Sequence, residues 1–216
     1  MVEIKFCGMT RPEDARAAAA IGARYVGVIL ADGPRALTDA AARAVLDAVP
    51  ETTATVGVFG SVSPEEVAMR ATRLRLRVVQ LHGDADADMV AQVRQRWTGQ
   101  IWPVVRVAGS ELPATASDLF DVADAVVLDS RVPGKLGGTG VSLPWDELSE
   151  RIARLRSRRA KLVLAGGLRP DNVARAVSAL GPDVVDVSSG VESTTGVKDP
   201  DMMRAFRDAA LHKQVR

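Results

Sequence analysis

Residues capable of acid–base chemistry lie where short apolar runs of the sequence end. Cys7 follows the first run, His82 follows the fourth, and Asp129 closes the sixth. A thiolate can act as a base or nucleophile when nearby cations or helix termini lower its pKa, and a buried carboxyl group with a raised pKa can act as a general acid. The alternatives stay open: a buried apolar cysteine, a loop-capping aspartate and a hydrogen-bonded structural histidine.

Small residues that suit an anion follow the seventh and eighth apolar runs. They are Gly166, Gly167, Ser188, Ser189 and Gly190. Their main-chain N–H groups could converge on phosphate oxygens, aided by the N-terminus of a helix predicted to begin near Pro170. Tight turns alone would also explain the glycines, but two such loops in these positions favour a phosphate site.

Two further side chains could contact a ligand. Arg35, in Gly33-Pro34-Arg35, follows the second apolar run and is either solvated or available to hold a carboxylate through its two-pronged guanidinium group. Asp186 lies within the eighth run, close to the predicted phosphate loops.

The apolar runs themselves are short and rich in Val, Ile and Leu, as expected for strands buried on both faces. They span Val2–Phe6, Tyr25–Leu30, Ala54–Phe59, Val78–Leu81, Ile101–Val107, Ala125–Leu128, Lys161–Ala165 and Val184–Val187. Helical patterns separate them, and the weakest of these is the fifth. These patterns cover Pro12–Ala20, Asp39–Val49, Pro64–Arg73, Asp86–Trp97, Glu111–Asp121, Trp145–Arg156, Pro170–Leu180 and Asp201–Leu211. Thr38 and Ser63 are the expected N-caps of the second and third helices.

Strands that alternate with helices predict a parallel sheet, and eight such units favour a closed (β/α)8 TIM barrel over an open doubly wound sheet. The first strand leads into Cys7-Gly8-Met9-Thr10 rather than a glycine-rich dinucleotide-binding turn. No linker or composition shift divides residues 1–216, so we expect one barrel domain. Since the carboxyl ends of barrel strands form the active site, the residues above should meet at one mouth.

Composition excludes several other classes. Lys plus Arg (28) and Asp plus Glu (27) nearly balance, so no global field attracts nucleic acid. No apolar run is long enough for a membrane span, and Glu3 and Lys5 interrupt any signal peptide. One cysteine and two histidines, His82 and His212, offer no metal-ligand set. We therefore expect a cytoplasmic protein without a metal, membrane or nucleic-acid partner.

Eight motifs along nearly the whole chain match those of a known family. They are Lys5-Phe6-Cys7-Gly8-Met9-Thr10, Val56-Gly57-Val58-Phe59, Val79-Gln80-Leu81-His82-Gly83, Leu128-Asp129-Ser130, Gly137-Gly138-Thr139-Gly140, Ala165-Gly166-Gly167-Leu168-Arg169-Pro170-Asp171-Asn172-Val173, Asp186-Val187-Ser188-Ser189-Gly190-Val191-Glu192 and Gly196-Val197-Lys198-Asp199. With these motifs the sequence resembles the phosphoribosylanthranilate isomerase family of tryptophan biosynthesis. The chain departs from the family around Val28–Leu37, where the family's aromatic residues are missing. Arg106 is a further charge for which the resemblance offers no role.

The resemblance implies an Amadori rearrangement of N-(5-phosphoribosyl)anthranilate to 1-(o-carboxyphenylamino)-1-deoxyribulose 5-phosphate. It makes Cys7 the general base and Asp129 the general acid, and it pairs Arg35 with the anthranilate carboxylate. His82 and Asp186 would lie beside the sugar, and the two Gly/Ser loops would hold the phosphate. Two proton transfers need no metal or organic cofactor. The only implied partner is the small phosphorylated substrate, bound by a monomer or homodimer.

Two other functions remain as alternatives. The related histidine-pathway isomerase performs the same rearrangement on a substrate with two phosphates, and a bifunctional enzyme would accept both substrates. In that family an aspartate follows the first strand of the barrel, whereas this chain has Cys7 at that position. The second alternative is a catalytically silent barrel that only binds a phosphorylated sugar.

Overall fold

A computed structural model describes residues 1–107, 109–130, 143–155 and 159–212. The strands are β1 (Glu3–Phe6), β2 (Tyr25–Ile29), β3 (Ala54–Phe59), β4 (Val78–Leu81), β5 (Gln100–Val107), β6 (Ala125–Ser130), β7 (Lys161–Leu164), β8 (Val184–Val187), β9 (Glu192–Thr194) and β10 (Val197–Lys198). The helices are α1 (Pro12–Ala20), α2 (Asp39–Leu46), α3 (Pro64–Arg73), α4 (Ala87–Arg94), α5 (Ala116–Val122), α6 (Trp145–Leu155), α7 (Val173–Leu180), α8 (Pro200–Leu211) and the short 3₁₀ helix η1 (Ser189–Val191).

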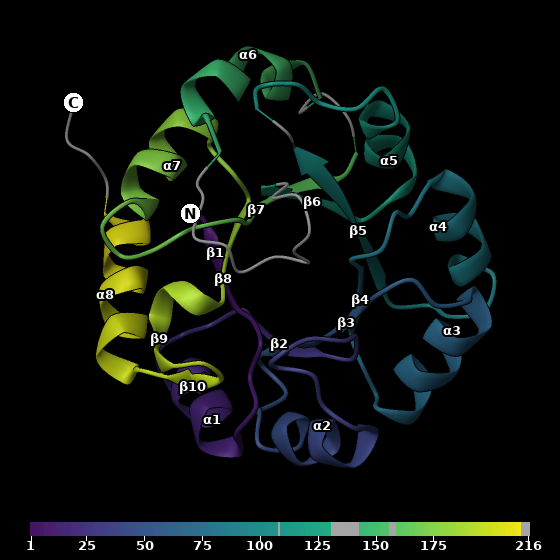
Figure 1. The fold of residues 1–216 in the computed structure, drawn as a ribbon, viewed down its shortest axis with the longest axis vertical. Coiled ribbons are helices and arrows are strands. Elements are labelled where there is room, and N and C mark those ends of the chain that lie inside the picture. The colour runs from purple at the N-terminus through teal and green to yellow at the C-terminus, as the bar shows by residue number, and fades with distance from the viewer. Residues whose placement is uncertain (108, 131–142, 156–158, 213–216) are drawn as a thin grey trace.

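The first eight strands close into a barrel. Each pairs in parallel with its neighbour in sequence, and β8 returns to pair with β1. The helices form a ring around the strands (Figure 1). The predicted (β/α)8 TIM barrel is therefore confirmed.

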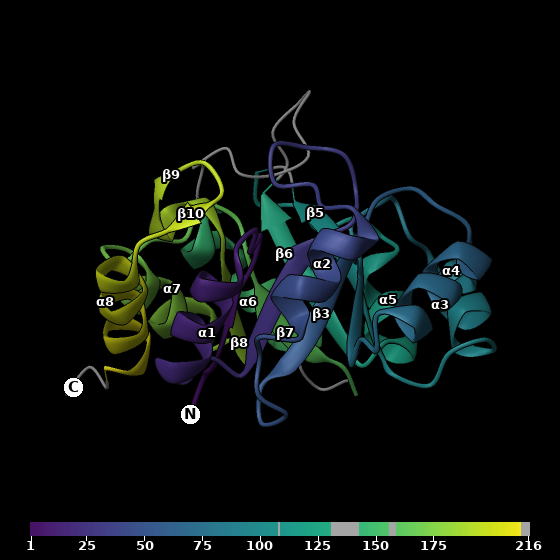
Figure 2. The ribbon, with the colours of Figure 1, turned by 90° about the horizontal axis from the view of Figure 1, so that it is seen from below.

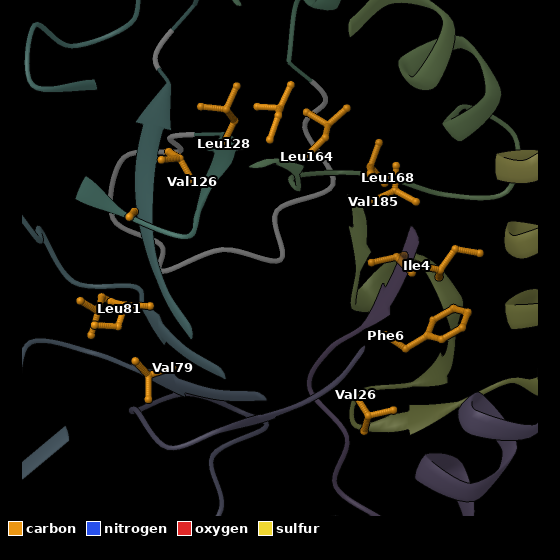
Figure 3. Close-up of a cluster of buried hydrophobic side chains, with 14 of the residues drawn as sticks. Ile4, Phe6, Val26, Val79, Leu81, Val126, Leu128, Leu164, Leu168 and Val185 are labelled. Carbon is orange, nitrogen blue, oxygen red and sulfur yellow. The ribbon is translucent and has the colours of Figure 1, made fainter. Parts of the chain in front are cut away.

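Alternation of side chains along the strands produces two separate apolar layers. Tyr25, Trp102 and Val127 belong to a cluster that fills the inside of the barrel. Phe6 and Leu81 belong to the larger cluster between strands and helices, and Figure 3 shows both pointing away from the barrel centre. Because both strand faces are buried, the strands are apolar runs, as the sequence predicted.

The helix starts differ from the predicted ones by three or more residues in two places, and the second and fourth helices each end three residues early, at Leu46 and Arg94. The fifth helix begins at Ala116, not Glu111, because Pro113 lies in the preceding turn, where its carbonyl accepts a hydrogen bond from the Ala116 N–H. The seventh begins at Val173, not near Pro170. The Asn172 side chain accepts from the Arg169 N–H at 2.8 Å and forms a turn first. The N-caps were predicted correctly: Thr38 and Ser63 each accept a hydrogen bond from the backbone three residues on.

The segment after β8 carries structure that the sequence analysis missed. η1 follows β8 at once, and β9 and β10 form a small antiparallel hairpin. Figure 2 shows this hairpin at the upper end of the barrel, opposite the N-terminus. The hairpin therefore stands beside the mouth formed by the carboxyl ends of the strands. Among the described residues, no helix is both long and apolar enough to cross a bilayer.

Candidate active site

A cavity of about 640 Å³ opens at the carboxyl ends of the strands. All ten residues that the sequence analysis singled out line it. They are Cys7, Arg35, His82, Asp129, Gly166, Gly167, Asp186, Ser188, Ser189 and Gly190. Its volume falls in the range of small-molecule sites. A second hollow of about 520 Å³, over α6 and α7, includes none of the ten.

Cys7 is held at the base of this cavity by the backbone that follows β1. Its N–H donates to the Val187 carbonyl at 2.9 Å, which continues the β1–β8 pairing by one residue. Gly8 then takes a positive φ of 68°. A Cβ on Gly8 would lie 2.7 Å from both Arg35 Cδ and Ser188 Oγ, so only glycine lets these side chains close over the turn. Cys7 is 7% exposed.

Burial and charge act on the Cys7 thiol in opposite directions. Burial raises its pKa, and nearby Lys5 opposes that shift. The carboxylate of Asp186 raises the pKa further, and the result is a pKa above the ordinary value. In the ligand-free chain near neutral pH, Cys7 is therefore mainly a thiol.

Asp129 points into the cavity from the end of β6. Burial raises its pKa to about 6, with a further contribution from Asp186. The Ser130 N–H and Arg106 oppose the shift. Because that pKa is close to neutrality, the carboxyl group can hold a proton and release it, as a general acid must.

Arg106 lies beside Asp129 on the neighbouring strand. The two residues are register partners on β5 and β6. Arg106 Nη2 also donates to the His82 carbonyl at 2.6 Å, which ties the end of β5 to the loop after β4. Arg106, unassigned from sequence, therefore holds His82 in place and favours the ionised form of Asp129.

His82 faces Asp129 across the mouth. Its Nε2 lies 3.7 Å from Asp129 Oδ2, and its Nδ1 lies 3.4 Å from Gln80 Nε2. The imidazole thus connects β4 with the candidate acid on β6. The tautomer of His82 decides whether each ring nitrogen donates or accepts in these contacts.

Arg35 is held by an acidic partner from the β9 hairpin. Its Nε and Nη2 donate to the two carboxylate oxygens of Glu192 at 2.7 and 2.6 Å. Lys198 donates to the same carboxylate at 2.7 Å and to the Ser188 carbonyl at 3.0 Å. Glu192 and Lys198 thus fix the guanidinium group at the cavity rim.

Two buried acceptors in the cavity have no hydrogen-bond partner within the part of the chain that the structure describes. Among the described residues, three buried side-chain polar atoms lack a hydrogen bond, and two of them are Gln80 Oε1 and Asp186 Oδ1. Both residues line the cavity. Leaving such an oxygen unsatisfied costs about 1–3 kcal/mol, so these two atoms are candidate acceptors for the hydroxyl groups of a ligand.

The loops after β7 and β8 form the remaining wall. Gly166 and Gly167 have φ values of 83° and 65°, and a Cβ on Gly166 would lie 2.7 Å from Asp129 Oδ1. A Cβ on Gly190 would lie 2.0 Å from the Leu168 carbonyl oxygen. Both glycines are therefore required by close packing, as a backbone-lined anion site would need.

Four residues that support the site were not singled out from sequence. They are Lys5, Gln80, Glu192 and Lys198, all inside the quoted motifs. For the first two a signal existed: strand alternation places Lys5 on the same side as Cys7, and Gln80 on the same side as His82. Glu192 and Lys198 depend on an unpredicted hairpin. The Gly137–Gly140 motif lies outside the described residues.

Known proteins resemble the chain in sequence across the whole barrel. The model of a family described as N-(5'-phosphoribosyl)anthranilate (PRA) isomerase matches residues 4–209. The chain belongs to this family. The isomerase of Pseudomonas fluorescens is 38% identical over 209 residues, which cover 96% of this chain and 98% of that protein. That of Acidithiobacillus ferrooxidans is 39% identical over 207 residues, covering 95% and 96%.

Solved structures of the family agree with the fold. The phosphoribosyl anthranilate isomerase of Thermotoga maritima superimposes with a TM-score of 0.86 at 31% identity, covering 97% of this chain and 98% of that one. A structure of phosphoribosyl anthranilate isomerase in complex with reduced 1-(o-carboxyphenylamino)-1-deoxyribulose 5-phosphate gives a TM-score of 0.83 at 31% identity, with the same coverage of both chains. Family membership makes the chain a phosphoribosylanthranilate isomerase of tryptophan biosynthesis, in preference to the two alternative functions considered from sequence.

Proposed function

We propose that Cys7 is the general base and Asp129 the general acid with which this isomerase performs its Amadori rearrangement. The observation that carries the proposal is their shared cavity: a lone thiol and a carboxyl group with a pKa of about 6 line the same pocket as the two glycine-containing loops. The reaction needs one proton donor and one acceptor around a phosphorylated sugar.

The chemistry begins at the ring oxygen of the ribose. Protonated Asp129 donates its proton to that oxygen, the furanose opens, and the anthranilate nitrogen becomes part of a protonated Schiff base. The Cys7 thiolate then removes the C2′ proton and becomes a thiol. The resulting enolamine tautomerises to the 1-amino-2-ketone. Burial of Asp129 serves the first step, because it keeps the pKa of the carboxyl group near the working pH.

The substrate carboxylate is assigned to Arg35. A guanidinium group has five N–H donors, and Glu192 engages those of Nε and Nη2 on one edge. The Nη1 side is directed elsewhere and can receive a second carboxylate in the same fork geometry. Glu192 thus orients Arg35 and leaves donors for the substrate.

The sugar and phosphate are assigned to opposite parts of the cavity. Asp186 Oδ1 and Gln80 Oε1 accept hydrogen bonds from ribose hydroxyl groups, and His82 contacts the same sugar. The phosphate lies between the loops of Gly166–Gly167 and Ser188–Gly190, whose backbone can approach closely.

We infer that the small phosphorylated substrate is the sole ligand. A monomer or homodimer remains our prediction for the assembly; one Thermotoga maritima structure is described as monomers of the dimeric enzyme.

The loss of substrate fluorescence tests these roles. N-(5-phosphoribosyl)anthranilate is made in situ, and its decay is followed with wild type, Cys7→Ala and Asp129→Asn. Each variant should turn over roughly 10²–10⁴-fold more slowly while still binding the reduced product analogue. Near-normal turnover by either variant would show that the corresponding role is wrongly assigned.

A further inference from the structure

Lys5 is a fully buried cation inside the barrel, directly below the cavity. Its side chain is 0% exposed, although the neighbouring inward side chains of the barrel are largely apolar. Strand alternation turns Ile4 and Phe6 outward and Lys5 inward. A buried ammonium group costs several kcal/mol unless it is paired, so its place in the barrel needs an explanation beyond packing.

One partner of Lys5 is Asp186. The two residues are register partners on β1 and β8, and Lys5 Nζ lies 2.7 Å from Asp186 Oδ2. A single carboxylate oxygen accounts for only part of the donor capacity of an ammonium group, which has three N–H bonds. The other Asp186 oxygen has no hydrogen-bond partner among the residues that the structure describes, and Asp186 lines the cavity.

Lys5 also lies near the Cys7 sulfur. Lys5 is in β1 and Cys7 follows that strand directly, and both side chains lie over Gly27 of β2. A Cβ on Gly27 would lie 3.0 Å from Cys7 Sγ and 3.3 Å from Lys5 Cε. The absence of a side chain at position 27 therefore gives the thiol and the end of the lysine a common space. The positive charge of Lys5 lowers the pKa of the thiol and opposes the effect of burial.

The other charged groups around Cys7 make a smaller contribution. Lys198 from β10 favours the thiolate weakly, and Arg35 lies close enough to sense its charge. Asp186 from β8 opposes the thiolate. Of the groups that favour the thiolate, Lys5 has the largest effect, and it counters part of the rise in pKa that burial causes.

Acid–base catalysis at this site needs protonation states that the free chain disfavours. Asp129, with a pKa of about 6, is mostly ionised at neutral pH, whereas the mechanism needs its proton. The Cys7 thiol, with a raised pKa, is mostly protonated, whereas the mechanism needs its thiolate. A group that favours the thiolate without donating a proton to the substrate would raise the reactive population.

We propose that the Lys5 ammonium is a positioning residue that stabilises the thiolate form of Cys7. The inference deepens the proposed function, because it assumes that Cys7 is the base. During the reaction the sulfur takes the C2′ proton and the ammonium group keeps all of its own, so Lys5 carries charge and orientation but transfers nothing. Asp186 holds the ammonium in place through Oδ2.

The direct test is the ionisation of Cys7 without substrate. Because Cys7 is the only cysteine of the chain, the pH dependence of alkylation by iodoacetamide reports this thiol alone. Lys5→Met should move the inflection to higher pH by roughly one unit or more, which lowers the thiolate fraction about tenfold at a given pH. An unchanged inflection in a folded Lys5→Met variant would overturn the proposal.

Two matched variants separate charge from packing. Lys5→Arg retains a cation and should recover much of the thiolate. Lys161→Met removes a lysine that pairs with a carboxylate, Glu3, at 2.9 Å near the opposite end of the barrel, and should leave the inflection of Cys7 in place. In turnover, Lys5→Met should lower kcat more than it raises KM. An equal shift in all three variants would mean a general loss of structure and contradict the specific role.

Wild-type NMR gives the answer even if Lys5→Met does not fold. The assigned Lys5 side-chain resonances should show a step at the pH where Cys7 ionises, and Cys7→Ala should remove that step. A Lys5 resonance that ignores Cys7 ionisation would refute the proposal. These readouts need no activity: they can succeed while full activity of Cys7→Ala disproves the base assignment, or fail while that assignment stands.

Discussion

The two ends of the barrel interior treat their polar side chains in opposite ways. At the amino end, Glu3 accepts from Lys161 at 2.9 Å and from the Tyr25 hydroxyl at 3.2 Å. At the carboxyl end, Asp186 Oδ1 and Gln80 Oε1 are buried without a hydrogen-bond partner in the described segments of the chain. The Glu3 carboxylate at the amino end is thus bonded within the protein, whereas the two acceptors at the carboxyl end are available to a ligand.

This difference separates residues that stabilise the fold from residues that perform the reaction. Satisfied polar groups and packed aromatics contribute to stability, whereas unsatisfied buried acceptors and a carboxyl group with a raised pKa lower it. The carboxyl end therefore lowers the stability of the fold, and the ligand should recover that stability on binding. Substitutions at the two ends should accordingly affect different measurements.

The largest effect on activity is expected for Asp129→Asn. The amide cannot donate the proton that opens the ribose ring, so kcat should fall by roughly 10²–10⁴. Thermal unfolding should show a variant at least as stable as wild type, because a buried ionisable group has been neutralised. A variant that loses stability in parallel with activity would contradict the claim that Asp129 serves the reaction and not the stability of the fold.

Trp102→Ala should show the converse pattern at the amino end. Trp102 is fully buried, its ring lies 4.7 Å from that of Tyr25, and its Nε1 donates to Gln100 at 3.2 Å. Loss of the indole should cost about 3–5 kcal/mol of unfolding free energy, measured by denaturant titration. The folded fraction should keep kcat near wild type. A selective collapse of kcat would mean that this layer also shapes the site.

The pH dependence of stability sharpens the comparison further. The pKa of Asp129 is about 6 in the folded chain, against 3.8 for the unperturbed group. A raised folded pKa gives stability that is complete below about pH 4 and is lost as pH rises through about 6. The loss amounts to about 3 kcal/mol. Relative to wild type, Asp129→Asn should therefore gain about this much between acid and neutral pH. Parallel stability curves would contradict a raised pKa.

The smallest of the four effects is expected for Arg35→Ala. It removes the proposed carboxylate contact, which would form in the bound substrate as well as in the transition state, so KM should rise about tenfold with little change in kcat. Arg11→Ala is the matched control, since Arg11 pairs with Asp14 outside the cavity. A fall in kcat with constant KM would place Arg35 in the proton-transfer step instead.

Sequence pattern was sufficient for the barrel and for ten of the residues that line its mouth. Buried parallel strands produce apolar runs, and the carboxyl-end rule then gathers Cys7, Asp129 and the glycine loops without coordinates. Helix boundaries were less certain, since Asn172 and Pro113 form turns that a periodic pattern does not show. The pairing of Arg35 with Glu192 depends on a hairpin that brings together residues 157 positions apart.

Burial was the main quantity that the sequence could not provide. The raised pKa of Asp129 comes first from desolvation, which depends on how β5, β6 and β7 pack around the carboxyl group. The unpartnered oxygens of Gln80 and Asp186 are likewise defined only when every neighbour is placed. Lys5 would have been found by strand alternation alone, because a lysine on the inward face of a barrel strand is unusual in itself.

The most direct test is a crystal structure of this chain with the reduced product analogue 1-(o-carboxyphenylamino)-1-deoxyribulose 5-phosphate. Cys7 Sγ and the Asp129 carboxyl group should approach the sugar from opposite sides, each within about 4 Å of the chain of carbons. The phosphate should lie between Gly167 and Ser189, and Asp186 Oδ1 should accept a hydroxyl group. A phosphate bound elsewhere, or a thiol directed away from C2′, would contradict the assignment of both proton transfers.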